Sequence, residues 1–174
     1  TRDAVDTHYN AFGFEMILVD TAGIRKKSKV HEDIEFYSVM RAIRAIEDCD
    51  VCLFMIDANE GLQKQDLSIF SVIEKNKKGV VLLVNKWDTI EKDTHSTKSF
   101  EEDILSKIAP FTDLPILFVS ALSKQRIHKA IETALEVYHN RMQKITTSKL
   151  NEIMLDAIQK NPPPSTKGKY IKIK

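Results

Sequence analysis

Three short polar segments of the sequence have the residue types of a nucleotide site, and each directly follows an apolar run. Asp20-Thr21-Ala22-Gly23 follows the run 16–19, Asn85-Lys86-Trp87-Asp88 follows 80–84, and Ser120-Ala121-Leu122 follows 116–119. In a sheet of parallel strands the loops after the strands gather at one edge, where α/β proteins bind their ligands. The spacing therefore predicts that the three segments share one site.

The first segment has the chemistry of a magnesium and phosphate site. Asp20 supplies a hard oxygen ligand of the kind that holds Mg²⁺, usually through water. Gly23 lets a backbone amide approach a terminal phosphate with no side chain between them. Thr21 and Ala22 complete the segment. The pattern D-x-x-G also occurs in ordinary turns, so by itself it does not distinguish a ligand site from a purely structural turn.

The second segment fits a reader of guanine. The Asp88 carboxylate can accept hydrogen bonds from N1–H and the N2 amino group of guanine, whereas adenine would leave that carboxylate unpaired. The apolar stem of Lys86 can lie along the base plane. Asn85 can brace neighbouring loops, and Trp87 is expected to pack rather than to take part in chemistry. At the end of a buried strand this four-residue pattern is specific.

The third segment offers small residues and a backbone donor. The amide of Ala121 is predicted to donate to the guanine carbonyl, and the small Ser120 and Ala121 side chains allow the base to come close. Leu122 completes the segment. By itself this pattern is uninformative, so the order of the three segments along the chain carries the prediction.

The elements that must position these segments follow from hydrophobic periodicity. Near-continuous apolar runs predict strands buried on both faces over 16–19, 51–56, 80–84 and 116–119. Helical spacing predicts helices over 36–46, 63–75, 100–108, 127–142 and 150–158. Strand alternating with helix predicts an α/β fold, with a mostly parallel sheet and helices on both faces. Residues 7–13 are expected to form an antiparallel strand that turns back at 11–13.

The pattern changes after residue 142. The helix expected over 150–158 ends at Asn161-Pro162-Pro163-Pro164, because proline lacks an amide proton and clashes with the preceding turn. Residues 169–174 alternate charged and apolar side chains, as a half-buried strand does. We expect one domain over 1–143 and the beginning of a second over 144–174.

Together the three segments resemble the third, fourth and fifth motifs of the translation-factor class of P-loop GTPases. Stretches 1–6, 20–25, 37–42 and 85–88 look like the second GTPase domain of the Der (EngA) family of bacterial ribosome-assembly GTPases, and 162–169 is similar to the entry into that family's KH-like domain. The resemblance covers essentially the whole chain. It implies a P-loop NTPase-like fold followed by the start of an α+β KH-like domain.

The resemblance also implies roles and ligands. Thr1 matches the first-switch threonine that senses Mg²⁺ and the γ-phosphate, and Asp20 and Gly23 match the second switch. The remaining segments match the guanine readers and the fifth motif. The implied ligands are GTP or GDP with Mg²⁺, and the implied partners are ribosomal RNA and the large (50S) subunit. Relatives of this class use K⁺ in place of an arginine finger, so K⁺ is a further candidate cofactor of a complete protein.

One position departs from Ras-like GTPases, which place a glutamine after the glycine of the second switch to orient the attacking water. Here that residue is Ile24, which cannot hydrogen-bond water. The resemblance therefore implies a GTPase with slow intrinsic hydrolysis whose water is positioned by other means.

The sequence contains no phosphate loop of the form G-x-x-x-x-G-K-[ST], since none of its five glycines are five positions apart. By resemblance, the first strand, the phosphate loop and the first helix of the fold are missing, which leaves a slot beside the strand 16–19. The sequence represents a fragment of a longer chain, which we favour, or a short chain that fills the slot by association. Hydrolysis by these residues alone is expected to be impaired.

Two alternatives stay open. Residues 141–174 hold eight Lys and Arg against two acidic residues, so this end carries +6 while the whole chain carries +1. It suits a non-hydrolysing RNA- or ribosome-binding module, although charge alone fits a solvated tail equally well. A tRNA-modification GTPase of the MnmE type is the other alternative, but its expected C-terminal cysteine is absent, since the chain ends in Ile173-Lys174.

Composition sets the remaining limits. The 174 residues are 43% hydrophobic and 29% charged, which is typical of globular domains. No apolar run approaches the roughly 18 residues of a membrane helix, and the beginning lacks a signal-peptide pattern. We expect a cytoplasmic protein without a membrane partner, in an oligomeric state that the sequence leaves open. Cys49 and Cys52 form a C-x-x-C, in which redox or metal binding is less expected than a core role for Cys52.

Overall fold

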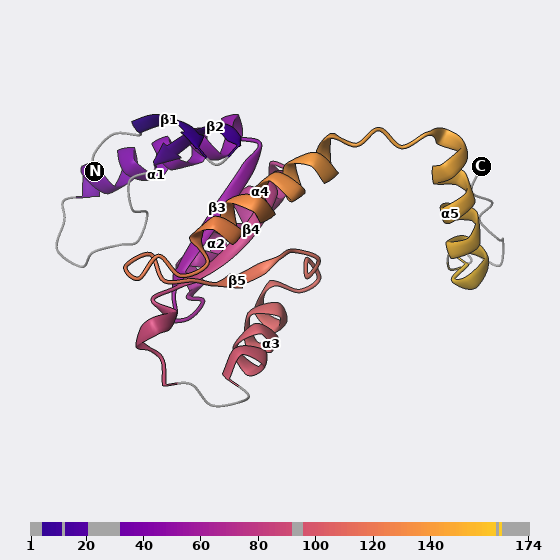
Figure 1. The fold of residues 1–174 in the computed structure, drawn as a ribbon. Helices are drawn as coiled ribbons and strands as arrows, with labels where there is room; N and C mark the ends of the chain where they lie inside the picture. Colours follow the sequence, from indigo (N-terminus) through magenta and orange to yellow (C-terminus); the bar gives the residue numbers. More distant parts are fainter. Residues whose placement is uncertain (1–4, 12, 21–31, 92–95, 163, 165–174) are drawn as a thin grey trace. The chain divides into compact units, whose positions relative to one another are not determined.

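A computed structural model describes residues 5–11, 13–20, 32–91, 96–162 and 164 (Figure 1). The strands are β1 (Val5–Ala11), β2 (Phe14–Asp20), β3 (Val51–Asp57), β4 (Gly79–Asn85) and β5 (Ile116–Phe118). The helices are α1 (Glu32–Asp48), α2 (Lys64–Lys75), α3 (Ser96–Ile108), α4 (Ile127–Met142) and α5 (Thr147–Lys160), and a 3₁₀ turn, η1, covers Trp87–Thr89. The chain divides into two compact units, Thr1–Arg141 and Met142–Lys174.

Strands β1 and β2 form an antiparallel hairpin, as the sequence predicts. The register runs from Val5 opposite Asp20 to Ala11 opposite Phe14. Gly13 lies in the turn with φ +80°, a left-handed conformation that glycine adopts without a steric penalty. The hairpin ends at Asp20, the first residue of the first predicted site segment.

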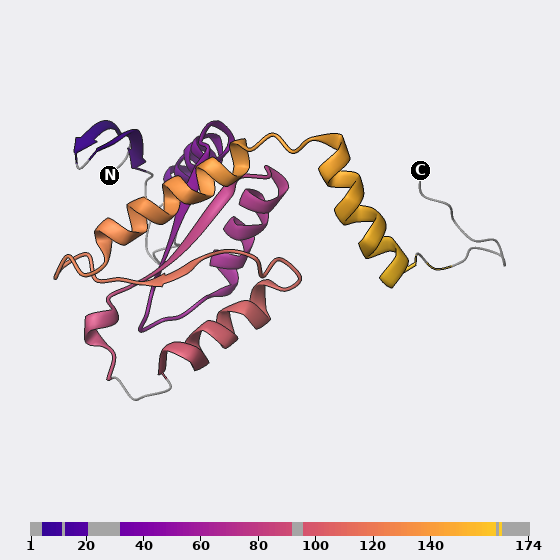
Figure 2. The same cartoon turned by 45° about the vertical axis from the view of Figure 1, so that its right-hand side comes forward.

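The second sheet is parallel, in the order β3-β4-β5, with β4 in the centre. Alternate residues of β4 enter two different cores. Val80, Leu82 and Val84 join a cluster with side chains of α2 and α3, whereas Val81 and Leu83 pack with side chains of α4. Figure 2 shows these helices on the two faces of the sheet. The apolar run 80–84 is continuous because both faces of β4 are covered. The prediction of a parallel sheet with helices on both faces is confirmed.

The facing edges of the two sheets are unpaired. Among the described strands, β2 pairs with β1 and β3 pairs with β4, so no hydrogen-bonded ladder joins β2 to β3. Two cavities of about 710 and 750 Å³ lie between these strands. Ile17 and Val19 of β2 and Leu53 and Met55 of β3 border them and are 39–57% exposed. The slot that the sequence predicts beside β2 is therefore present.

The second unit contains α5. Thr146 precedes this helix, and its hydroxyl oxygen accepts a hydrogen bond from the amide of Lys149, which satisfies one donor of the first turn. Leu150, Ile153 and Met154 stay exposed on α5. The strand predicted over 169–174 lies outside the described residues. No helix in the described part of the chain has the length and apolar character needed to cross a membrane.

Candidate nucleotide site

The second predicted segment begins at the carboxyl end of β4 and turns away sharply. Asn85 is the last residue of the strand, and Lys86 adopts a left-handed conformation with φ 61°. The backbone amide and the hydroxyl of Thr89 donate to the Lys86 carbonyl oxygen, at 3.0 and 2.8 Å. Non-glycine residues in this conformation are uncommon and cluster at functional sites. The turn lifts the side chains of Lys86 and Asp88 clear of the sheet, where both are exposed.

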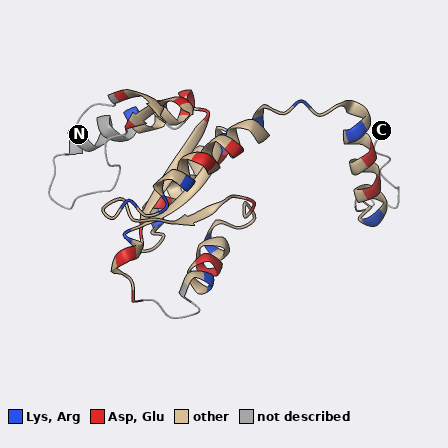
Figure 3. Cartoon of the chain, in the orientation of Figure 1, with Lys and Arg blue, Asp and Glu red and all other residues tan. Residues whose placement is uncertain are grey.

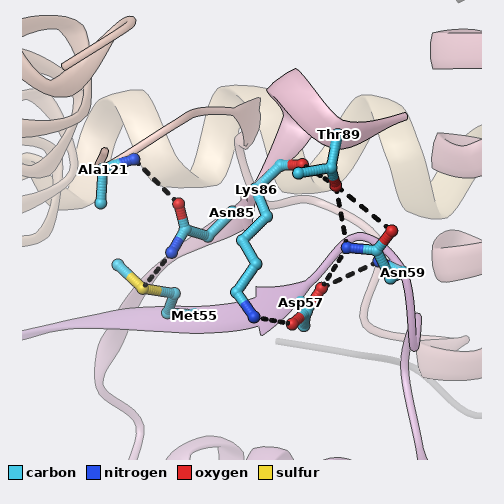
Figure 4. A network of polar contacts seen from close by, with 7 residues as sticks. All are labelled: Met55, Asp57, Asn59, Asn85, Lys86, Thr89 and Ala121. Carbon is cyan, nitrogen blue, oxygen red and sulfur yellow. Dashed lines mark hydrogen bonds and ion pairs between the residues drawn. The ribbon is translucent and has the colours of Figure 1, made fainter. Parts of the chain in front are cut away.

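Asn85 ties the second predicted segment to the third. Its side-chain oxygen accepts a hydrogen bond of 3.0 Å from the backbone amide of Ala121, and its side-chain nitrogen donates to the Met55 sulfur at 3.5 Å (Figure 4). The amide of Trp87 also donates to the carbonyl oxygen of Val119, at 3.1 Å. The predicted bracing role of Asn85 is confirmed. The Ala121 amide is already engaged in this structure, so its donation to guanine stays a prediction.

A polar network that the sequence did not predict holds Lys86. The Lys86 ammonium lies 2.6 Å from an oxygen of Asp57, the last residue of β3 (Figure 4). The same carboxylate accepts hydrogen bonds from the backbone amide and the side-chain nitrogen of Asn59, at 2.9 and 3.0 Å. Asn59 in turn donates to the Thr89 hydroxyl at 2.9 Å. The network joins the loop after β3 to the loop after β4.

Electrostatics in this network favour the charged form of Asp57. Its hydrogen bond with Lys86, followed by the bond from the Asn59 amide, lowers the pKa of Asp57 to about 2. The strand register explains this contact. The strand ends Asp57 and Asn85 are paired in register across β3 and β4, which places the residue after Asn85 next to Asp57. Asp57, Asn59 and Thr89 are the site residues that sequence reasoning missed.

Trp87 anchors the turn from beneath. Its ring lies 4.4 Å from that of Phe118 and 5.6 Å from that of Phe100, and the residue is 6% exposed. Aromatic contacts of this kind add to the free energy gained by burial. The prediction that Trp87 packs is confirmed, and the turn that carries Lys86 and Asp88 has a rigid base.

The remaining predicted site residues differ in their burial and in their contacts. Ser120 is fully buried, and its hydroxyl oxygen accepts from the amide of Ser123 at 3.1 Å. Leu122 is 90% exposed. Asp20 ends β2 and borders the 710 Å³ cavity together with Met55, which also contacts Asn85. Four predicted site residues lie outside the described residues: Thr1, Thr21, Ala22 and Gly23.

The described residues bring two of the three predicted segments together. Asp88, Lys86 and the loop of Ala121 lie at the carboxyl ends of β4 and β5, where a planar base can meet a carboxylate and an apolar stem. In the described part of the chain, no group of three or more His, Cys, Asp and Glu side chains could hold a metal ion. Asp20 is an exposed carboxylate at a strand end, which suits one oxygen ligand of Mg²⁺.

The chain resembles known GTP-binding proteins over most of its length. Residues 3–160 match the Elongation factor Tu GTP binding domain. The chain is 62% identical over its whole length to GTPase Der from Flavobacterium johnsoniae, and 62% identical over 175 aligned residues to GTPase Der from Bacteroides fragilis strain YCH46. In both cases the chain spans 40% of the length of the relative.

Solved structures show the same fold. A crystal structure of Era in complex with MgGDPNP and nucleotides 1506–1542 of 16S ribosomal RNA aligns with a TM-score of 0.68 and 29% identity, covering 79% of this chain and 45% of that one. A probable GTP-binding protein engB aligns with a TM-score of 0.66 and 14% identity, covering 80% of this chain and 85% of that one. The predicted P-loop GTPase fold is confirmed.

Proposed function

Because the chain belongs to the family of elongation factor Tu GTP-binding domains, we propose that it supplies the guanine-reading part of a Der-type GTPase. Such a protein hydrolyses GTP to GDP and phosphate as a switch during assembly of the large ribosomal subunit. The observation that carries the proposal is the 3.0 Å bond between Asn85 and the Ala121 amide, which joins two of the three predicted segments into one site.

Each residue has a role in the proposal. Asp88 accepts from the paired donors of guanine, and the stem of Lys86 supports the base. Asn85 holds the loop of Ser120, Ala121 and Leu122 at the position where the guanine carbonyl would lie. Asp20 holds Mg²⁺ through water, and Thr1 and the segment Thr21-Ala22-Gly23 sense the γ-phosphate.

The base preference can be tested by exchanging hydrogen-bonding partners. Xanthine carries a carbonyl group where guanine carries its N2 amino group. Asp88→Asn replaces one acceptor by a donor, so it should weaken GDP binding and strengthen xanthosine diphosphate binding. The magnitude expected for leaving a buried partner unpaired is on the order of tenfold or more. Asp113→Asn, in the loop after α3, is a matched control. A variant that binds both nucleotides as the unaltered chain does would contradict the proposal.

We further propose that the slot between β2 and β3 takes one more strand, and that the polypeptide supplying this strand carries the phosphate loop. Support comes from the two unpaired strand edges and the exposed apolar side chains that border the slot. The residues of this chain alone are then impaired in hydrolysis, because phosphate contacts dominate such catalysis.

Leu53→Lys tests the slot, because it puts a charge among its apolar side chains. In a longer protein that contains the phosphate loop, this variant should lose GTP hydrolysis and stability together. Lys64→Met, on the exposed start of α2, is the control. GTP hydrolysis by the 174-residue chain alone, at the rate of the longer protein, would contradict the proposal.

Contact with RNA is the second part of the proposal. Era, which is 29% identical over the aligned part, was crystallised with 16S ribosomal RNA. In this chain Lys144, Lys149 and Lys160 lie in the second unit, and Figure 3 shows basic and acidic residues along α5. We propose that residues 144–174 begin a KH-like domain that contacts ribosomal RNA in a cytoplasmic protein, and that K⁺ assists hydrolysis.

Salt dependence separates this assembly role from the alternatives. Phosphate contacts by three or four lysines should make RNA affinity fall steeply as salt rises. A flat response would contradict RNA binding. RNA binding that persists in a protein with no measurable guanine preference would favour the non-hydrolysing RNA-binding module. Preference for tRNA over ribosomal RNA would favour a GTPase of the MnmE type.

A further inference from the structure

Two cysteines lie in contact at the junction of α1 and β3, at the end of β3 opposite to Asp57. Cys49 follows the last residue of α1, and Cys52 is the second residue of β3. Their sulfur atoms are 3.3 Å apart. The two thiols are in contact within one short segment of the chain, three residues apart.

Two cations are anchored on the same loop. The Lys78 ammonium donates to the Glu47 carbonyl oxygen at 2.7 Å, and the Arg141 guanidinium donates to the Asp50 carbonyl oxygen at 2.5 Å. These carbonyl groups lie on either side of Cys49 in the sequence. Positive charge next to a cysteine stabilises the thiolate, which is the reactive form.

The two sulfur atoms are not equivalent. The hydrogen bond from the Cys52 thiol, assisted by Lys78, lowers the pKa of Cys49 to about 7, although partial burial and Asp50 oppose this. The same bond and burial raise the pKa of Cys52. When both thiols are protonated, the Cys49 thiol can instead donate to the Ile46 carbonyl oxygen at 3.4 Å. Cys49 is therefore the attacking sulfur, and Cys52 holds a proton that it can give up later.

In the 174-residue chain, where the slot between β2 and β3 is open, both cysteines are partly exposed and small molecules can reach them. Metal binding does not explain the pair. Cys49 borders both cavities between β2 and β3, and Cys52 borders the first. The second cavity also carries acidic Asp6 and Glu15 from the hairpin and basic Arg44 from α1. The described residues contain no further ligands that could complete a metal site with the two thiolates. Oxidation of the two thiols to a disulfide is the chemistry that two cysteines in contact can carry out by themselves.

We propose that Cys49 and Cys52 form a reversible dithiol–disulfide site that reacts with peroxides. The Cys49 thiolate attacks one oxygen of the peroxide, the O–O bond breaks, and Cys49 becomes a sulfenic acid. The other oxygen leaves as hydroxide or alkoxide and takes a proton from solvent. The Cys52 sulfur then attacks the Cys49 sulfur, the S–O bond breaks, and the leaving hydroxide takes the Cys52 proton as water. Two thiols are oxidised to one disulfide while the peroxide is reduced, and a dithiol reductant restores them. This site is independent of the guanine reader.

Hydrogen peroxide and intact mass spectrometry test the proposal on the chain as it is. Treatment should give a monomer that is lighter by two hydrogen atoms. This product should not react with iodoacetamide until dithiothreitol has reduced it. Cys49→Ser should abolish the product, and Cys52→Ala should leave a sulfenic acid on Cys49. A disulfide only between two chains, or oxidation of Cys49 beyond sulfenic acid while Cys52 stays free, would overturn the proposal.

Alkylation rates test the electrostatic part without any oxidant. At pH 7, Cys49 should react about fivefold faster than a cysteine in a short unstructured peptide, because a larger thiolate fraction outweighs its lower nucleophilicity. Cys52→Ala should remove most of this advantage and Lys78→Met a smaller part of it, whereas Lys75→Met, on the exposed end of α2, should leave it unchanged. Equal rates for Cys49 and the peptide, or equal effects of the two lysine variants, would overturn the assignment of Cys49. Fluorescence of Trp87 verifies that each variant is folded.

Discussion

Asp57 is the most informative position to perturb, because it links two loops of the site through one carboxylate. Asp57→Asn keeps the shape of the side chain and removes its charge. The ion pair with Lys86 is lost, and the two bonds from Asn59 lose their charge assistance. The Lys86 side chain is 58% exposed, so the pair itself is worth only about 0.2–1 kcal/mol. With the weakened bonds from Asn59, we expect the free energy of unfolding to fall by about 1–1.5 kcal/mol.

The pH dependence identifies the cause of that loss. The pKa of Asp57 in the folded chain, about 2, lies below its ordinary value of 3.8. A depressed pKa means that the stabilisation is present above the ordinary value and is lost as the pH falls through the folded value. The difference between the unaltered chain and Asp57→Asn should therefore shrink as the pH falls from about 4 to about 2.

Urea unfolding followed by the fluorescence of Trp87, the single tryptophan, measures this difference next to the site. Asp103→Asn is the matched control, because Asp103 pairs with Lys107 at the same 2.6 Å on the exposed surface of α3. We expect the control to lose less than about 0.5 kcal/mol. Equal losses in the two variants, or a loss in Asp57→Asn that is unchanged at the lower pH, would refute the reasoning.

Further predictions concern the sheet and the loop that it supports. In Gly79→Ala the new Cβ would lie 2.7 Å from Val137, which should lower the free energy of unfolding by about 1–3 kcal/mol in urea titrations, and Val137→Ala should restore part of it. Leu82→Ala opens a cavity in the fully buried centre of β4 and should cost about 2–5 kcal/mol by the same measurement, whereas a loss below about 1 kcal/mol would contradict the described core. Asn85→Ala leaves the Ala121 amide without its acceptor, so amide hydrogen exchange at Ala121 should accelerate on the order of tenfold, and an unchanged rate would contradict the bridge.

The fold was largely predictable from the sequence because β4 and its neighbours have strong local signals. The run 80–84 is apolar at every position, which is typical of a strand that is covered on both faces. The slot beside β2 was also predictable, but from resemblance rather than from periodicity. The site segments at the ends of β4 and β5 followed from the rule that parallel strands end at one edge.

The finer geometry of the site was not predictable, for physical reasons. Nothing in the residue type of Lys86 requires a left-handed conformation, since that is imposed by the bonds from Thr89 and the burial of Trp87. The contact of Asp57 with Lys86 depends on strand register, which short apolar runs leave open. The sulfur contact of Cys49 with Cys52 likewise depends on where α1 ends.

The central claim is that the ends of β4 and β5 form one guanine-reading site. Amide chemical shifts of the ¹⁵N-labelled chain, titrated with GDP and separately with ADP, test it most directly. We predict that GDP shifts the amides of residues 85–88 and 120–122 together, with one common affinity, and that ADP leaves them unchanged. Equal shifts with both nucleotides, or GDP shifts confined to residues elsewhere in the chain, would contradict the account.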